Sequence, residues 1–189
     1  YKMKVVAVQG SPNAEGNTAL LLKSYLEGVK ENHANITIDE IFVQEKNIGH
    51  CKGCLSCKTS SDICAIQDDM QGIYGKVSEA DALIFATPVY WWNISSQLKK
   101  FMDRLYGLDY EDLENKKFVL LMTYEGELPN SGPPLVESIF REICQYLGME
   151  FVQLYGVCTG GDISVEENAD AQKTAYELGK NLLSIKKVI

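Results

Sequence analysis

The chain has 189 residues, enough for one sizeable α/β domain and too few for two, so we expect a single domain over residues 1–189. Its 46% hydrophobic and 23% charged residues are typical of a folded globular protein. The net charge of -8 argues against a nucleic-acid partner, since a phosphate backbone requires a basic surface. No membrane span is expected, because the longest uncharged stretch, residues 82–98, contains Pro88, Asn93 and two serines.

Five apolar segments rich in β-branched residues are predicted to be strands: residues 4–10, 35–43, 81–88, 116–124 and 150–157. Helical patterns lie between and after them: residues 17–32, 68–80, 95–107, 134–148 and 165–185. Such alternation implies right-handed βαβ units and an open sheet with helices on both faces. We therefore expect an α/β, flavodoxin-like fold with a five-stranded parallel sheet in the order 2-1-3-4-5. Ligands would bind where the first, third and fourth strands end.

The segment GSPNAEGNT, residues 10–18, leaves the first strand and enters the first helix. It offers hydroxyl and amide groups from Ser11, Asn13, Asn17 and Thr18, and the N–H groups of a helix start favour an anion. It lacks both Gly-Lys-Ser/Thr and G-x-G-x-x-G, so neither a nucleoside triphosphate nor a dinucleotide is favoured. Two interpretations stay open: a phosphate monoester held by neutral donors, and an ordinary helix start capped by Asn17 or Thr18.

The segment TPVYWWNISSQLKKFMDR, residues 87–104, follows the third strand at the same end of the sheet. It begins with an uncharged, aromatic edge: Pro88, Tyr90, Trp91 and Trp92. Asn93 adds a polar group, and Ser95 or Ser96 is expected to cap the next helix. A flat redox-active ring needs such a surface. The alternative is that both tryptophans belong to the core or to a dimer contact. A phosphate and a flat ring in one crevice favour FMN.

These two segments together resemble the NADPH-dependent FMN reductase and iron–sulfur flavoprotein branch of the flavodoxin-like superfamily. The likeness rests on motifs within residues 1–105 and on element order beyond them. It implies contacts to the FMN phosphate from Ser11, Asn13, Asn17, Thr18 and the backbone of Ala19. It implies an isoalloxazine lined by Pro88, Val89, Tyr90, Trp91 and Asn93. Residues 122–134 match less well and supply ring-edge contacts from Thr123 and Gly126. A basic residue is frequent in the family where Asn13 stands, so weaker phosphate binding is expected.

The resemblance implies an oxidoreductase in which NADH or NADPH reduces FMN and FMN reduces a small-molecule acceptor: a quinone, free flavin, nitro compound or metal ion. The cofactor carries this chemistry, so no catalytic side chain is identified. The resemblance also implies a homodimer or higher homo-oligomer, with the flavin site completed by a neighbouring subunit. The second hypothesis is an electron carrier fed through the cysteines. A signalling domain of receiver type is disfavoured, because Gln9 and Gly10 stand where it needs an acidic cluster.

The segment CKGCLSCKTSSDIC places four cysteines in C-x2-C-x2-C-x6-C spacing: Cys51, Cys54, Cys57 and Cys64. Four close thiolates suit a single [4Fe–4S] cluster, whereas zinc more often uses two separated CxxC pairs. The resemblance leaves a cluster and free thiols both open, since iron–sulfur flavoproteins carry such a motif ahead of DDM, here residues 68–70. No secretory pattern is seen, so thiols or metal ligands in a reducing cytoplasm are expected rather than disulfides.

Three expectations concern side chains outside these motifs. Asp68 or Asp69 is expected to cap the following helix. Two cysteines, Cys144 and Cys158, are expected in the core. The polar side chains of the helix after the aromatic segment are expected mostly on a solvated face, with an ion pair between Lys99 and Asp103: Lys99, Lys100, Asp103 and Arg104.

Overall fold

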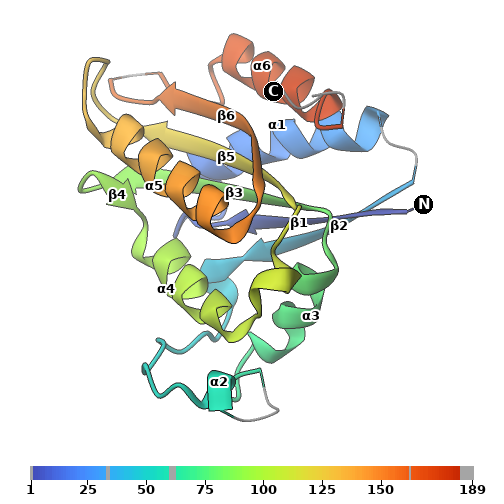
Figure 1. The fold of residues 1–189 in the computed structure, drawn as a ribbon. Helices are drawn as coiled ribbons and strands as arrows, with labels where there is room; N and C mark the ends of the chain where they lie inside the picture. Colours follow the sequence, from blue (N-terminus) through green and yellow to red (C-terminus); the bar gives the residue numbers. More distant parts are fainter. Residues whose placement is uncertain (1, 33–34, 60–62, 162, 184–189) are drawn as a thin grey trace.

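The computed structural model of the protein describes residues 2–32, 35–59, 63–161 and 163–183 (Figure 1). The strands are β1 Met3–Gln9, β2 Ile36–Phe42, β3 Ala82–Tyr90, β4 Asn93–Ile94, β5 Lys117–Tyr124 and β6 Glu150–Cys158. The helices are α1 Asn17–Asn32, α2 Ser56–Thr59, α3 Gln71–Glu79, α4 Ser96–Arg104, α5 Gly132–Leu147 and α6 Ala169–Lys180. Short 3-10 turns are η1 Val43–Glu45, η2 Leu105–Gly107 and η3 Tyr110–Asp112. Among the helices in these ranges, none is both long and apolar enough to cross a bilayer.

The long strands form one parallel sheet in the order β2-β1-β3-β5-β6. Numbered without the short strand β4, this is the predicted flavodoxin-like order 2-1-3-4-5, which is confirmed. The strand that the sequence does not predict is β4, which pairs antiparallel with the end of β3. The usual signal for such a hairpin is Asn-Gly or Asp-Gly at its turn, and here the turn residues are Trp91 and Trp92.

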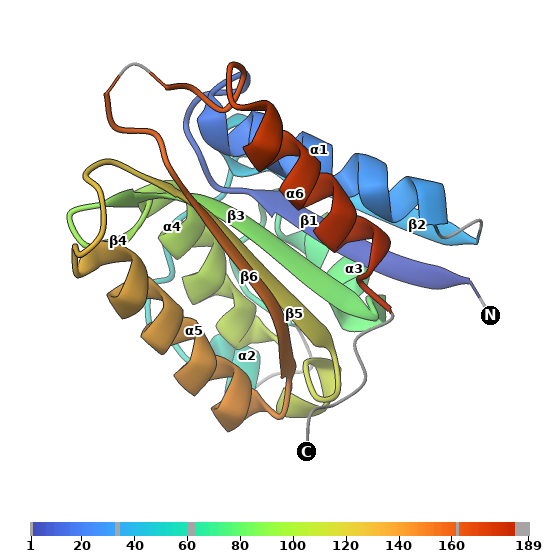
Figure 2. The same cartoon turned by 90° about the horizontal axis from the view of Figure 1, so that it is seen from above.

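Different helices cover the two faces of the sheet: α1 and α6 lie on one face, and α3, α4 and α5 on the other (Figure 2). Strand side chains alternate between these faces, so β1 directs Val5 and Ala7 toward α1 and α6, and Val6 and Val8 toward the opposite layer. Because both sets are buried, the inner strands are almost continuously apolar, as the sequence shows.

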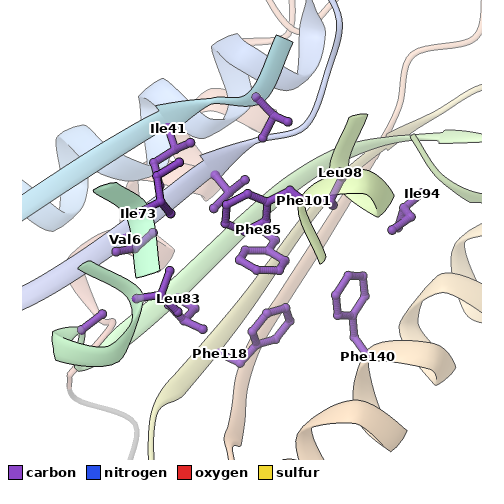
Figure 3. Packing of buried hydrophobic residues seen from close by; sticks show 14 of the residues in the cluster. Val6, Ile41, Ile73, Leu83, Phe85, Ile94, Leu98, Phe101, Phe118 and Phe140 are labelled. Carbon is purple, nitrogen blue, oxygen red and sulfur yellow. The ribbon is translucent and has the colours of Figure 1, made fainter. Parts of the chain in front are cut away.

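Phe85 on β3 lies at the centre of the core beneath α4 and α5 (Figure 3). The rings of Phe101, Phe118 and Phe140 meet it edge-on, with centroids at 5.9, 5.2 and 6.1 Å. Edge-to-face pairs of this kind stabilise by about 0.5–1.5 kcal/mol beyond the area they bury. Since Phe101 belongs to α4, this packing fixes the helix that follows the aromatic segment.

On the opposite face, α1 and α6 approach each other through two glycines. A Cβ atom at Gly28 would lie 1.9 Å from the Tyr176 carbonyl oxygen, and one at Gly179 would lie 2.0 Å from the Tyr25 carbonyl oxygen. Both obstacles are backbone atoms of a neighbouring helix, which a side-chain rotation cannot move. The close contact between α1 and α6 therefore depends on glycine at both positions.

Gly28→Ala should force the two helices apart and lower the free energy of unfolding by about 1–3 kcal/mol, the usual effect of overpacking. Urea unfolding followed by circular dichroism measures the change. The matched control is Gly75→Ala in the middle of α3, where a Cβ meets nothing within 4 Å; this variant should be stabilised by up to about 1 kcal/mol. Equal effects of the two substitutions would contradict the packing argument.

Candidate functional site

Hydrogen bonds join the loops that follow β1, β3 and β5 at one edge of the sheet. The Gly10 N–H donates to the Ala86 carbonyl at 2.8 Å, and the Ser95 hydroxyl donates to the Gly10 carbonyl at 2.5 Å. On the other side, the hydroxyl oxygens of Thr18 and Thr123 lie 2.7 Å apart in a buried contact. The parallel pairing thus brings together the three segments that the sequence predicts to form one crevice.

The loop after β1 presents backbone donors at the start of α1. The Leu20 N–H donates to the Gly16 carbonyl at 3.0 Å, so the N–H groups of residues 16–19 precede the helical ladder. The loop is shaped by its own side chains: Ser11 Oγ accepts from the Asn13 N–H, and Asn13 Oδ1 accepts from the N–H two residues later, each at 3.1 Å. Because these bonds use the side-chain oxygens as acceptors, the hydroxyl and carboxamide hydrogens are left as donors for an anion.

Asn17 and Thr18 connect the start of α1 to distant parts of the chain. Asn17 Oδ1 accepts from the Val165 N–H at 2.8 Å, and the buried Thr18 hydroxyl pairs with Thr123. Among the described residues, neither side chain accepts from the backbone of α1, so the structure does not support the ordinary capped start. If Thr123 donates in its pair, the Thr18 hydroxyl hydrogen stays available to a ligand. Ala19 follows half-buried in the first turn.

The end of β3 is a strained hairpin. Its two-residue turn consists of Trp91 and Trp92, with φ of 47° and 60°. Turns with two positive φ values normally contain Asn or Gly, because the left-handed region costs a side chain roughly 1–2 kcal/mol per residue. Strain of this kind concentrates at functional sites, where the surrounding structure holds it in place. The sequence does not reveal this turn, since its residues contradict the local preference.

The hairpin presents aromatic rings to the solvent. Trp91 is 90% exposed, Trp92 55% and Tyr90 48%. The interpretation that both tryptophans belong to the core is therefore wrong. Pro88 is buried behind them and Val89 half-buried, while Asn93 Oδ1 accepts from the next backbone N–H at 2.8 Å. Of the predicted ring-lining residues, Tyr90, Trp91 and Asn93 are thus exposed at the end of β3, while Pro88 and Val89 lie deeper.

Ser95 is the side chain that ends this hairpin and begins α4. Its hydroxyl accepts from the Leu98 N–H at 3.1 Å, which confirms the predicted cap and selects Ser95 over Ser96. Its own N–H donates to the Thr87 hydroxyl at 3.1 Å. Ser95 therefore holds the end of β3 through its backbone N–H and the position of Gly10 through its hydroxyl.

The end of β5 contributes Thr123, and the loop after it contributes Gly126. Thr123 is buried against Thr18, whereas Gly126 has a φ of 75° and its carbonyl accepts from Asn130 Nδ2 at 2.6 Å. At the other end of this loop, a Cβ at Gly132 would lie 3.2 Å from Val89, so the first turn of α5 lies against the hairpin. Thr123 is thus joined directly to the first turn of α1, while Gly126 lies in the loop that follows β5.

The four cysteines lie on the segment between η1 and α3. Cys51 and Cys54 are exposed, Cys57 and Cys64 are half-buried, and all four are free thiols. Hydrogen bonds from Ser56 lower the pKa of the exposed Cys54 thiol. The chemistry and spacing of these donors fit an iron–sulfur cluster. Within the described ranges, however, no three Cys, His, Asp or Glu side chains are placed together to hold a metal ion.

Arg104, at the end of α4, is a buried charge and the one exception among the four side chains expected mostly on a solvated face. The Lys99–Asp103 ion pair is present at 2.5 Å, but Arg104 is buried rather than on the solvated face. Its guanidinium pairs with Asp68, from Nη1 to Oδ2 at 2.5 Å and from Nη2 to Oδ1 at 3.1 Å. The available signal is spacing: Leu98, Phe101 and Arg104 recur every three residues on the buried side of α4.

Neither Asp68 nor Asp69 directly precedes α3, but Asp68 Oδ1 accepts from the Met70 N–H at 3.0 Å in the turn that leads into the helix. The residue before α3 is Met70, without a side-chain cap, while Asp69 Oδ2 accepts from the Asn47 N–H at 2.7 Å. Burial disfavours the charged form of Asp68, but hydrogen bonds from Arg104 and from two backbone N–H groups outweigh it and hold its pKa below the usual value. The ion pair is therefore charged in the folded protein at neutral pH.

The two remaining cysteines differ. Cys144 on α5 is buried in the core, as predicted, and burial raises the pKa of its thiol to about 12. Cys158 at the end of β6 is only half-buried, so its assignment to the core is wrong. The physical reason is that β6 is the edge strand of the sheet, with fewer neighbours to cover it.

Comparison with known proteins places this geometry among flavin-dependent enzymes. The model of the family described as NADPH-dependent FMN reductase matches residues 3–153. An iron–sulfur flavoprotein of Archaeoglobus fulgidus is 34% identical over 182 residues, which cover 95% of this chain and 79% of that protein. An iron–sulfur flavoprotein of Methanocaldococcus jannaschii is 41% identical over 102 residues, but the match spans 54% of this chain and only 51% of that relative.

Solved structures agree on the fold. An FMN-dependent NADH-azoreductase from Bacillus anthracis, in complex with FMN, superposes with a TM-score of 0.73 and 16% identity. The superposition covers 95% of this chain and 99% of the other. At so low an identity the likeness concerns the arrangement of strands and helices, and the side chains of the crevice must be judged in this chain itself.

Asp68→Asn should leave the Arg104 charge buried without its partner and lower the free energy of unfolding at about pH 7 by roughly 3–5 kcal/mol. Since the pKa of Asp68 is depressed by folding, the pair stabilises above the unfolded pKa of about 3.9 and is lost as pH falls through the folded value. The difference from wild type should therefore shrink toward about pH 3. Urea unfolding at both pH values measures it.

The control is Glu79→Gln, which removes the carboxylate of an exposed ion pair with Lys4. Surface pairs contribute little, so this variant should differ little from wild type at either pH. A deficit in Asp68→Asn that stays constant with pH would contradict the assignment.

Proposed function

This chain belongs to the NADPH-dependent FMN reductase family, and we propose that it holds FMN in the crevice above β1, β3 and β5 and uses it to carry electrons from NADH or NADPH to a small-molecule acceptor. The observation that carries the proposal is the meeting of helix-start donors and an exposed aromatic edge at one end of the sheet. When bound, FMN supplies the redox chemistry, accepting a hydride and giving two electrons to the acceptor. The protein contributes binding, orientation and environment.

The phosphate would be held by neutral donors at the start of α1. The segment 10–18 contains Glu15 as its sole charged residue, and the N–H groups of residues 16–19 are oriented toward the N-terminus. Together with the partial positive charge of the helix dipole, these groups stabilise an anion without a lysine or arginine. Ser11, Asn13 and Thr18 add hydroxyl and amide donors around the same point.

The ring would lie against the hairpin that ends β3. Tyr90 and Trp91 offer apolar faces, and the backbone around Asn93 offers polar groups that can fix the edge of a heterocycle. A binding surface that stays exposed and strained in the free protein is stabilised when a flat ring covers it. We therefore assign the strain at Trp91 to ring binding.

We propose that a second copy of the chain packs against the surface next to the flavin site. Large apolar side chains remain exposed along the hairpin, the loop after β5 and the outer side of α5: Tyr90, Trp91, Trp92, Leu128, Leu135 and Ile139. Exposed apolar side chains of this size on neighbouring segments are typical of an interaction site. Packing of a partner there would enclose the ring and complete the flavin site. The acceptor and the cytoplasmic location stay predictions.

A second candidate role is supported by the four free cysteines and by the relative from Archaeoglobus fulgidus that is named an iron–sulfur flavoprotein. We propose that Cys51, Cys54, Cys57 and Cys64 hold a [4Fe–4S] cluster. Such a cluster transfers single electrons, so it would connect a two-electron flavin to a one-electron partner. Iron and acid-labile sulfide, about four of each per chain, are the expected stoichiometry of one cubane.

Thr18→Val should weaken FMN binding about tenfold, because a hydroxyl donor to a charged phosphate contributes roughly 1.5 kcal/mol or more. Riboflavin lacks the phosphate, so its affinity should be unchanged. Titration of each flavin followed by fluorescence measures both. The control is Thr37→Val on β2, far from the loop, which should bind both flavins as wild type does. An equal loss of affinity for FMN and for riboflavin would contradict the placement of the phosphate beside Thr18.

The substitution Trp91→Gly should distinguish the backbone strain at residue 91 from the contribution of the indole ring to FMN binding. Glycine adopts the observed φ of 47° freely, so the flavin-free protein should gain about 1 kcal/mol in free energy of unfolding while its affinity for FMN falls. In the wild type, NADPH added without oxygen should bleach the bound flavin. The control is Asn115→Gly, which has a φ of 63° at the opposite end of β5 and should leave FMN binding unchanged. Unaltered FMN affinity in Trp91→Gly would place the ring elsewhere.

A further inference from the structure

One buried side chain holds both ends of the cysteine segment. Arg104 Nη1 donates to the Gly49 carbonyl at 2.9 Å, just before Cys51. Its Nη2 donates to the Ile66 carbonyl at 3.4 Å, just after Cys64. The segment that carries all four cysteines therefore begins and ends at the same guanidinium.

The same guanidinium reaches one of the four sulfurs. Arg104 Nη2 lies 3.5 Å from Cys64 Sγ, a hydrogen-bond distance for sulfur. Cys64 also packs against the core that contains Phe101. By contrast, Cys51 and Cys54 are exposed. Cys64 is thus the thiol of this set whose position is fixed by a buried, charged donor.

The charge of Arg104 is itself held in place. Asp68 accepts from both terminal nitrogens, and its side chain is 5% exposed while that of Arg104 is 1% exposed. Tyr74 donates its hydroxyl to the Arg104 carbonyl at 3.1 Å. A two-pronged pair of this kind fixes the plane of the guanidinium before any ligand binds. One N–H of Nη2 is used by Asp68, so the other is shared between the Ile66 carbonyl and the Cys64 sulfur.

We propose that Arg104 is the positioning residue of the iron–sulfur site: it fixes Cys64 and both ends of the segment, and the other three thiols close onto Cys64 when iron and sulfide are taken up. This inference rests on the cluster proposed above. This inference explains why the four cysteines have the chemistry of cluster ligands although no three metal-binding side chains of the described residues lie together in the structure. A second consequence is electronic, because a cationic donor to a ligand sulfur favours the more negative, reduced cluster and raises its reduction potential.

The position of Arg104 also relates the site to the flavin crevice. Helix α4 begins directly after its cap, Ser95, beside the aromatic hairpin and ends at Arg104 beside the cysteine segment, with α2 below it (Figure 1). Its 9 residues span about 13 Å at 1.5 Å per residue. Phe101 packs the middle of this helix against Phe85, so the two sites are fixed at the two ends of one rigid element.

The test compares Arg104→Lys with Arg141→Lys, which alters the other arginine of the chain. Lysine keeps the charge opposite Asp68 but loses the fork that reaches Gly49, Ile66 and the Cys64 sulfur together. Arg141 forms an exposed ion pair with Glu137 and serves as the control. Each protein is reconstituted without oxygen using ferrous iron and sulfide, its iron and sulfide are assayed, and the midpoint potential is measured by titration followed by electron paramagnetic resonance.

Arg104→Lys should bind the cluster about 10–100-fold more weakly than wild type, the usual loss when a group supporting a metal ligand is removed. The cluster that does form should have a lower midpoint potential, while FMN content stays that of wild type. Arg141→Lys should match wild type throughout. If wild type itself takes up no iron and sulfide, the cluster proposal fails. If wild type loads and Arg104→Lys loads with equal affinity and potential, the cluster stands and the role of Arg104 is refuted.

A second pair of variants applies if Arg104→Lys does not fold. Cys64→Ser removes the fixed thiol, whereas Cys51→Ser removes an exposed one. Cys64→Ser should abolish iron uptake, and Cys51→Ser should keep part of it, because three ligands including the fixed one remain. Equal loss of iron in both variants would overturn the inference, since Cys64 would then have no special place among the four.

Discussion

Parallel pairing of β1, β3 and β5 is the constraint on which the candidate site depends. Because of this pairing, the three strands end at one edge of the sheet, and segments far apart in the sequence come within hydrogen-bond distance. Thr18 and Thr123, for example, are separated by 105 residues in the chain. The backbone bond from Gly10 to Ala86 continues this pairing beyond the strands. Gly10 has no room for a side chain there, because a Cβ would lie 2.8 Å from that of Leu98. The candidate site is thus a direct extension of the sheet.

The second constraint is the burial of the Arg104–Asp68 pair. Removing two charges from water is costly, and the cost is offset only when nearly all donors and acceptors are satisfied. Asp68 meets this condition with Arg104 and the N–H groups of Gly49 and Met70. Arg104 meets it except at Nε, which is buried without a partner. A pair that is expensive to bury is weak evidence for stability alone, which favours a role in placing the segment around it.

The sequence predicts the sheet and the three loops because these depend on local patterns: continuous apolar runs, Gly and Pro at turns, and a serine before α4. It does not predict features that arise from distant contacts. Asp68 and Arg104 are 36 residues apart, so no local pattern reveals the pair. The Trp91–Trp92 turn escapes detection for another reason, because its residues oppose the backbone conformation they adopt. Local rules fail most often where function is concentrated.

The two proposed cofactor sites are prepared to different degrees. Around the crevice, Ser95 and the Thr18–Thr123 pair fix the loops before any ligand is present, so binding there need not order the backbone. The cysteine segment is fixed at its ends and at Cys64, while Cys51 and Cys54 lie exposed. Uptake of a cluster would therefore couple to ordering of the loop, as is usual for metal sites whose ligands are gathered by the metal. Because α4 joins the two sites rigidly, ordering at the cysteines need not disturb the crevice.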